Sequence, residues 1–394
     1  MNRNIAILAG CQAVALIVSV TVVALAGLIG QSLAENKAFA TLPASTFVIG
    51  VALSTIPAAQ WMRIVGRRYG FMSGAAVGMV GGLLCSYAIY IGNFWLFGLG
   101  TFFLGTQNAF AHQYRFAAAE SASSDFKARA ISWVLAAGIV GGVLGPESSK
   151  FTKDFFAPYT FLGTYLSVIL LCLFVILLLT QLRLPSLTPE ERRETGRPLS
   201  EIVRQPVFAV AVLGAMVGFS VMSLVMTASP LAMIACDLSY SRTIFVIEWH
   251  VIGMFAPSFF TGHLIGRFGV LRIMVTGALL LFGSVAAAVA GISLYHFWIA
   301  LVLLGVGWNF LFIGGTTLLT DAHDPSEKAK VQGLNDFLVF GSVAIASLSS
   351  GGLLYVFGWN TVNLGAVPFL LAALVATLWL LLKRRREAEV GQSA

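Results

Sequence analysis

Long apolar runs separated by short polar stretches repeat along the whole chain of 394 residues. Each run has roughly 20 residues, enough for an α-helix to cross a hydrocarbon core about 30 Å thick. The pattern predicts an all-α integral membrane protein with twelve transmembrane helices. The expected spans are 5–29, 43–62, 70–91, 94–116, 130–147, 159–180, 207–230, 243–265, 271–292, 296–318, 334–356 and 361–382.

Composition and charge placement agree with this prediction. Hydrophobic residues make up 58% of the chain and charged residues only 10%, whereas soluble domains carry about 25% charged residues. Of the 24 Lys and Arg residues, 20 fall on the side of the membrane that holds the N-terminus. The positive-inside rule therefore predicts that both termini are cytoplasmic. The net charge of +7 is then expected to contact lipid headgroups, not nucleic acid.

A polar stretch after the sixth expected helix divides the chain into two halves. The prediction is an N-terminal six-helix half over 1–182, a cytoplasmic linker over 183–205 and a C-terminal six-helix half over 206–394. The halves echo each other: the loop at Gly66 and Arg67 matches the loop at Arg267 to Gly269, and Asn108 matches Asn309. Such a repeat predicts a substrate site between the halves, near the middle of the membrane.

The residues of these loops resemble those of the major facilitator superfamily. Residues 262–269, Gly-His-Leu-Ile-Gly-Arg-Phe-Gly, are similar to the Gly-rich basic signature of that superfamily. Gly266, and Arg63 in the first half, stand where an acidic residue is usual, so Asp336 is expected to offer Arg63 a partner. Residues 141–146 are similar to the tail of a motif associated with proton antiporters. The resemblance implies a carrier that works by alternating access.

Two pairs of potential metal ligands lie on the seventh and eighth expected helices. Met222 and Met226 are four residues apart, as are His250 and Met254, so each pair lies on one helix face. Because the two helices run antiparallel, Met226 is expected opposite His250, with Met222 opposite Met254 about 6 Å deeper. Pro257 is expected to bend the eighth helix.

Thioether sulfur and a single imidazole favour Cu(I) over harder cations, and thioethers bind without losing a proton. Methionine is also a flexible gap-filler in helix packing, so the same residues could serve packing alone. These residues therefore leave both copper binding and packing open.

This pair of motifs also resembles the signature of the CcoA-like copper importers, a bacterial branch of the superfamily. The resemblance covers Met222, Met226, His250 and Met254. It implies copper uptake across the bacterial inner membrane, and supply of copper for biogenesis of cytochrome c oxidase of the cbb3 type. The same branch includes riboflavin transporters, so riboflavin is the alternative substrate.

Further polar residues lie within the expected spans. Asn108, His112 and Arg115 share one stripe of the fourth helix and, with Asn309, are candidates for proton coupling or for lining a cavity. Arg115 could instead anchor the helix in the headgroup region. Cys236, in the loop after the seventh helix, is a possible entry thiol for copper.

The sequence thus predicts a monomeric transporter and not an enzyme, with copper as cargo and no resident cofactor. Trp308 on the tenth helix could instead belong to an aromatic wall for an organic molecule such as a flavin. The pattern is also compatible with a drug or metabolite exporter, or with a metal-binding sensor that keeps the carrier fold. No Walker-type phosphate loop occurs in the sequence.

Overall fold

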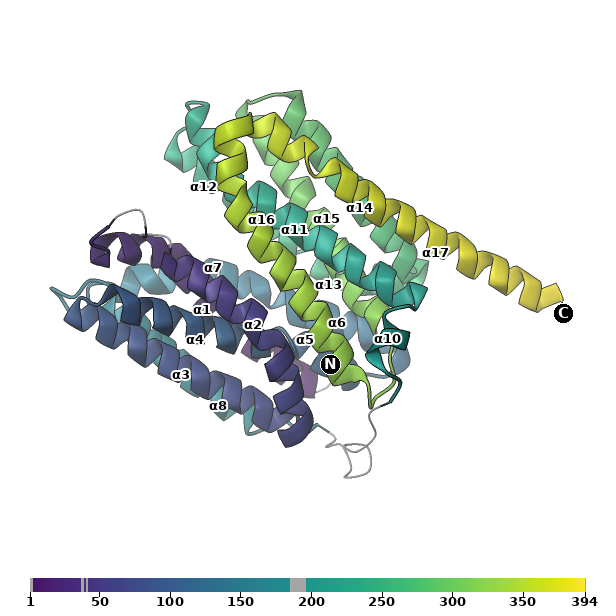
Figure 1. The fold of residues 1–394 in the computed structure, drawn as a ribbon, viewed down its shortest axis with the longest axis horizontal. Coiled ribbons are helices and arrows are strands. Elements are labelled where there is room, and N and C mark those ends of the chain that lie inside the picture. Colours follow the sequence, from purple (N-terminus) through teal and green to yellow (C-terminus); the bar gives the residue numbers. More distant parts are fainter. Residues whose placement is uncertain (1–2, 37–38, 40–41, 185–195, 394) are drawn as a thin grey trace. The chain divides into compact units, whose positions relative to one another are not determined.

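The computed structural model describes residues 3–36, 39, 42–184 and 196–393, and within them it is helical, without strands (Figure 1). Residues 185–195 of the predicted linker lie outside the described residues. The helices of the first sequence half are α1 (Arg3–Leu33), α2 (Leu42–Val65), α3 (Arg67–Ile91), α4 (Phe94–Ala111), α5 (Tyr114–Glu120), η2 (Ser124–Phe126), α6 (Lys127–Ala136), α7 (Gly138–Thr152) and α8 (Leu162–Leu179).

The second sequence half continues the all-helical pattern. Its helices are α10 (Leu199–Ile202), α11 (Pro206–Ala235), α12 (Tyr240–Phe255), α13 (Ser258–Phe268), α14 (Val270–Ala290), α15 (Leu294–Leu319), α16 (Lys328–Leu364) and α17 (Val367–Ser393). The described residues contain nine stretches long and apolar enough to cross a membrane, the last of which runs over both α16 and α17. The all-α membrane fold is as predicted, whereas the count of twelve spans remains a prediction.

Three of the expected spans consist of two helices each. The fourth is α4 followed by α5, the fifth is α6 followed by α7, and the eighth is α12 followed by α13. The last break falls at Ala256 and Pro257, as expected for a proline, which has no amide hydrogen to donate to the preceding turn. Between the eleventh and twelfth spans, Gly358 interrupts the helix with a φ of 77°.

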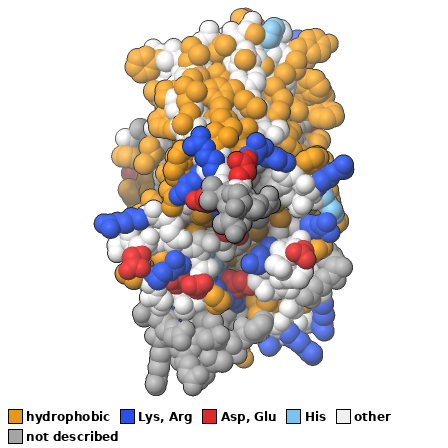
Figure 2. All heavy atoms as spheres, turned by 90° about the vertical axis from the view of Figure 1, so that its right-hand side faces the viewer, with side chains coloured by type: hydrophobic (Ala, Val, Ile, Leu, Met, Phe, Trp, Pro, Cys, Tyr) orange, Lys and Arg blue, Asp and Glu red, His pale blue; other side chains and the backbone are white. Residues whose placement is uncertain are grey.

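The molecule's surface has the character that a bilayer requires. Large side chains such as Leu170, Leu177, Val375 and Trp379 are exposed. On the face drawn in Figure 2, hydrophobic side chains cover a continuous area, and charged side chains gather apart from it. Exposed apolar area of this extent is unfavourable in water and favourable against lipid tails.

The helices group into two compact units, each of which combines segments from both sequence halves. The first unit comprises residues 1–122, 137–196 and 325–344. The second comprises residues 123–136, 197–324 and 345–394. The start of α16 therefore belongs with helices of the first sequence half, and α6 belongs with helices of the second.

The internal repeat seen in the sequence recurs in the backbone. Gly66 and Gly269 precede α3 and α14 with φ angles of 85° and 87°, a conformation that favours glycine. Within the first unit, α2 crosses α4 at Gly105, where a Cβ atom would lie 2.0 Å from the Phe47 carbonyl oxygen. Within the second, α12 crosses α15 at Gly305, where a Cβ atom would lie 2.7 Å from the His250 carbonyl oxygen.

Substitution of Gly105 tests the first of these crossings. Gly105→Ala places a methyl group against backbone atoms that no side-chain rotation can remove, so we expect a destabilisation of about 1–3 kcal/mol or more. The thermal midpoint of the purified protein in detergent measures it. Gly27→Ala is the matched control, because nothing lies within 4 Å of the added Cβ atom. Equal midpoints for both variants would contradict the close crossing.

Candidate functional site

His250 lies on α12 and is held by the neighbouring helix α15. Its side chain is 1% exposed, and its Nδ1 lies 2.8 Å from the Leu301 carbonyl oxygen. That acceptor can only receive a hydrogen bond, so Nδ1 carries the proton and Nε2 is left with a lone pair. Nε2 is buried and has no hydrogen-bond partner among the described residues. A buried acceptor of this kind is available to a ligand.

The other three predicted ligands lie on the same two helices as expected. Met222 is buried on α11, while Met226 on α11 and Met254 on α12 are half-buried. However, α12 packs mainly against α15 and touches α11 only lightly. The opposed arrangement of Met222 with Met254 and Met226 with His250 therefore remains a prediction. Among the described residues, no three His, Cys, Asp or Glu side chains group together to hold a metal ion.

Cys236 lies where α11 ends. It is the C-cap residue of that helix, is partly exposed and carries a free thiol. It therefore stands in the turn between the two helices that carry the Met and His residues. Its role as an entry thiol remains a prediction.

Asn309 bridges the break between α12 and α13. It is 0% exposed, and its Nδ2 donates to the Met254 carbonyl oxygen at 2.7 Å and to Ser258 Oγ at 2.6 Å. Its Oδ1 accepts from Thr261 Oγ1 at 2.7 Å. In a continuous helix the Met254 carbonyl would accept from the amide of Ser258. The Asn309 amide replaces that lost bond, so it supports the break at Pro257 from a neighbouring helix.

An aromatic cluster lies on α11, α12 and α15 of the second unit. Trp308 stacks on Phe312, with ring centroids 5.2 Å apart and an interplanar angle of 16°. Phe219 of α11 and Phe255 of α12 meet Trp308 edge to face, at 5.3 Å and 5.8 Å. Trp308 is 3% exposed, and its Nε1 has no hydrogen-bond partner among the described residues. The cluster therefore combines packed aromatic rings with a buried N–H donor.

Two of the candidate residues of the first half have local partners in the first unit. The Nδ2 of Asn108 donates to the Ser19 hydroxyl of α1. His112 ends α4 and stacks on Phe340 of α16 with ring centroids 3.9 Å apart. Both side chains therefore link α4 to other helices of the unit. Their roles in coupling or in lining a cavity remain predictions.

Arg115 is buried in an ion pair. Its Nη2 lies 2.5 Å from Oδ1 of Asp336, and the two side chains are 2% and 0% exposed. Gln113 Nε2 donates to the other carboxylate oxygen at 2.7 Å, and Asn335 Nδ2 donates to Oδ1 at 2.9 Å. Three donors thus compensate the buried carboxylate. The alternative that Arg115 anchors the headgroup region is wrong, because its guanidinium is enclosed by protein. The expected pairing of Asp336 with Arg63 is also wrong, since Asp336 pairs with Arg115.

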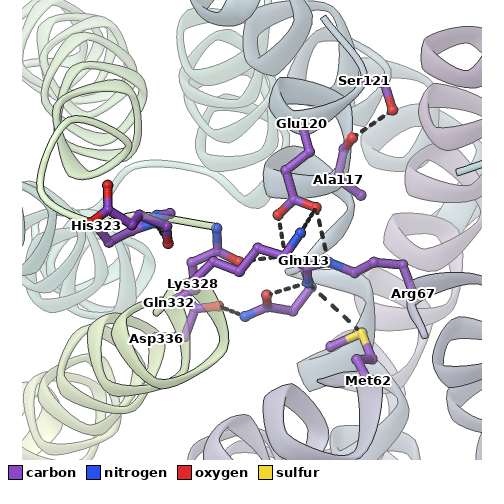
Figure 3. Close-up of polar contacts among 11 residues, drawn as sticks. Met62, Arg67, Gln113, Ala117, Glu120, Ser121, His323, Lys328, Gln332 and Asp336 are labelled. Atoms are coloured by element: carbon purple, nitrogen blue, oxygen red, sulfur yellow. Dashed lines mark hydrogen bonds and ion pairs between the residues drawn. The ribbon is translucent and has the colours of Figure 1, made fainter. Parts of the chain in front are cut away.

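A second charged cluster adjoins this pair (Figure 3). Arg67 Nη2 lies 2.5 Å from Oε1 of Glu120, and Lys328 Nζ lies 3.1 Å from Oε2. Arg67 also donates to Gln332 Oε1 at 2.5 Å and to Gln113 Oε1 at 2.9 Å. Burial by itself raises the pKa of the Glu120 carboxyl. The opposing effect of Arg67 and Lys328 is larger, so the pKa falls from 4.5 to about 2. The cluster therefore ties the start of α16 to α3 and α5.

The contribution of Glu120 to stability should change with pH only under acidic conditions. Because its pKa falls from 4.5 to about 2 on folding, the stabilisation is complete above pH 4.5 and is lost as the pH falls toward 2. We expect Glu120→Gln to lower the thermal midpoint by a constant amount near neutral pH, and the difference from the parent to vanish at acidic pH. The exposed Glu147, which pairs with Lys150, provides the control variant Glu147→Gln. A pH-independent difference for Glu120→Gln would contradict this assignment.

Sequence reasoning missed the role of Glu120 and gave Asp336 the wrong partner. Asp336 is the only acidic residue within the expected span 334–356. A lone carboxylate in an apolar helix indicates a buried partner, but a sequence does not show which of several arginines faces it.

Comparisons with known proteins show to which family this helical chain belongs. The family model described as Major Facilitator Superfamily matches residues 8–256 and 222–394. This chain belongs to the major facilitator superfamily. Among curated relatives, the riboflavin transporter RfnT of Brucella anthropi is 43% identical over 390 residues, covering 98% of both chains. The uncharacterized MFS-type transporter YdeG of Bacillus subtilis is 29% identical over 347 residues, covering 84% of this chain and 80% of its own.

Solved structures of superfamily members share the fold. The fucose:proton symporter FucP of E. coli superposes with a TM-score of 0.77 at 15% identity, covering 96% of this chain and 99% of its own. An outward-facing bacterial homologue of the iron transporter ferroportin gives a TM-score of 0.74 at 13% identity, covering 96% and 99%. The protein is thus a multi-pass membrane transporter and not an enzyme. Copper as its cargo finds no support in these comparisons.

Proposed function

We propose that this transporter carries riboflavin across the membrane. The observation that carries the proposal is the 43% identity with the riboflavin transporter RfnT, which extends over 98% of both chains. Identity spread over the whole length includes the helices that form a transport pathway, whereas the predicted copper motif rests on four residues. Riboflavin therefore replaces copper as the favoured substrate.

The aromatic cluster of the second unit supports this substrate. Riboflavin has a flat, three-ring isoalloxazine with carbonyl oxygens at its edge, and aromatic side chains favour stacked and edge-to-face contacts with such rings. Phe219 is half-buried, whereas Trp308 and Phe312 are buried. The buried Nε1 of Trp308 has no partner among the described residues and suits a carbonyl acceptor.

Trp308→Phe tests this part of the proposal. Phenylalanine keeps an aromatic ring against Phe312, Phe219 and Phe255 but removes the N–H donor. Loss of one neutral hydrogen bond predicts a riboflavin KM roughly threefold to tenfold higher. Initial uptake rates over a range of riboflavin concentrations measure it. Trp298→Phe is the control, because Trp298 contacts Trp249 outside this cluster. An unchanged KM for Trp308→Phe would show that the N–H group of Trp308 does not bind riboflavin.

The proposal includes the setting of the transporter. We place it in the bacterial inner membrane with both termini in the cytoplasm, because 20 of the 24 Lys and Arg residues lie on that side of the predicted topology. It works as a monomer, by alternating access of the halves 1–182 and 206–394, which the linker 183–205 joins.

Copper is the second candidate cargo, and one observation favours it. The lone pair of His250 Nε2 is buried without a partner among the described residues, and an imidazole beside thioethers suits Cu(I). If copper is the cargo, its ligands are Met222, Met226, His250 and Met254, with Cys236 as an entry thiol and supply of cbb3-type oxidase as the purpose.

Uptake by whole cells separates the two cargoes. A riboflavin auxotroph that lacks its own carrier should grow on low riboflavin when it produces this protein, and should accumulate labelled riboflavin. Radioactive copper uptake in the same cells should not rise above that of the empty vector. Met222→Ala and His250→Ala should leave copper accumulation unchanged. Copper uptake that rises with the protein and falls in both variants would favour copper, and riboflavin leaving loaded cells would favour an exporter.

A further inference from the structure

A small basic pocket lies in the first unit, beside the cluster of Glu120. Its walls come from the end of α2, the start of α3 and the residues that lead into α16. Three cationic side chains line it, Arg63, Arg67 and Lys328, and its lining contains no acidic residue. Arg67 and Lys328 share the single carboxylate of Glu120, so their two positive charges are only half compensated by it. The pocket therefore presents cationic side chains from three helices to an anion.

The size and the backbone of the pocket restrict what can bind there. It has room for about two water molecules, so only a small group such as a phosphate can enter it. Ser326 adds a hydroxyl to the lining, and the 37-residue helix α16 begins next to it at Lys328. The amides in the first turn of a helix have no carbonyl partners within the helix and favour a negative charge.

We propose that this pocket binds the phosphate group of an anionic phosphate ester. Arg63 comes from α2, Arg67 from α3 and Lys328 from α16, so the negative charge of one phosphate would be attracted to cationic side chains on three helices. The apolar side chain of Met62 forms part of the wall, so only the head of the ligand is held by charge. This inference goes beyond the proposed function, because it does not depend on which molecule the transporter carries.

Two sources can supply this chemistry: a soluble phosphate ester and the headgroup of an anionic lipid. Binding of glycerol 3-phosphate to the purified protein, measured by calorimetry with glycerol as the neutral control, tests the first. Retention of phosphatidylglycerol during purification, measured by native mass spectrometry, tests the second. We expect the parent to bind at least one of them and to ignore glycerol.

Variants connect this binding to the pocket. Arg63→Gln should weaken it by about tenfold or more. Ala329→Glu should abolish phosphate binding, because the new carboxylate occupies the pocket while all three cations remain. This variant tests the proposal even if Arg63→Gln folds poorly. Arg272→Gln removes an exposed cation outside the pocket and should change nothing.

Each possible result either supports the proposal or overturns it. Glycerol 3-phosphate binding that both pocket variants weaken identifies a soluble ester, and lipid retention that they weaken identifies a headgroup. Absence of both in the parent, or equal binding by the parent and the pocket variants, would overturn the proposal. Riboflavin plays no part in these measurements, so their outcome is independent of the cargo.

Discussion

Replacing Asp336 by asparagine is expected to destabilise the protein by about 3–5 kcal/mol. Asparagine keeps the shape of the side chain and an acceptor for Gln113, but it removes the negative charge that lies 2.5 Å from Arg115. The guanidinium then remains buried without the carboxylate of Asp336, which is the costly state of a broken buried ion pair. Thermal unfolding of the purified variant in detergent should show a large fall in the midpoint.

A second substitution distinguishes this explanation from a general intolerance of change. Arg115→Met combined with Asp336→Asn removes both charges, so the double variant should regain most of the lost stability. Asp321→Asn is the surface control, because Asp321 faces Arg384 across 3.6 Å with both side chains substantially exposed, and such pairs contribute about 1 kcal/mol or less. A double variant less stable than Asp336→Asn alone would contradict the account of the pair.

Replacing Asn309 by leucine should also have a large effect. Leucine has a similar size, but it leaves the Met254 carbonyl and the Ser258 hydroxyl without the donor that Asn309 provides. Each unpaired buried group costs about 1–3 kcal/mol, so we expect several kcal/mol of destabilisation and a fall in transport. The thermal midpoint and the uptake rate of the same preparation measure both effects.

The break at Pro257 explains why Asn309 is needed, and this gives a rescue experiment. Pro257→Ala allows α12 to continue into α13, so that the amide of Ser258 can reach the Met254 carbonyl. The double variant Asn309→Leu with Pro257→Ala should therefore be more stable than Asn309→Leu alone. Asn108→Leu serves as the comparison in the first half, because Asn108 has a single described side-chain bond, to Ser19, and its loss should cost less. No rescue by Pro257→Ala would show that Asn309 acts elsewhere.

Much of the fold could be predicted from the sequence because the bilayer imposes strict requirements. A helix that crosses it needs a long apolar run, so the runs identify helices whatever surrounds them. The bend at Pro257 was also predictable, since proline removes a backbone donor. Breaks between α4 and α5 and between α6 and α7 have no proline within them and were missed.

Contacts between helices were harder to predict. The expected arrangement of Met226 opposite His250 assumed that α11 and α12 lie directly side by side because a short loop joins them. In the structure α12 packs mainly against α15, where Gly253 and Gly305 allow close approach of the two backbones. Small residues, not the order of helices along the chain, decide which helices approach closely.

The partners of charged residues were also beyond the sequence. Arg115 lies near the end of an expected span, which favoured a headgroup contact, but its side chain is buried in an ion pair with Asp336. The position of a residue along a transmembrane span predicts its depth in the membrane, but not which side chains surround it. Choice of cargo has the same limit: the resemblance of four residues to a copper-importer signature implied copper, whereas similarity over the whole chain favours riboflavin.

The central claim is that this transporter carries riboflavin, and uptake by the purified protein tests it most directly. Proteoliposomes that contain the parent protein and trap unlabelled riboflavin should take up labelled riboflavin by exchange, at a rate that saturates and that excess external riboflavin suppresses. Empty liposomes provide the control. The account predicts exchange by the parent with a weaker apparent affinity in Trp308→Phe. Exchange no faster than in empty liposomes, with protein shown to be folded and inserted, would contradict it.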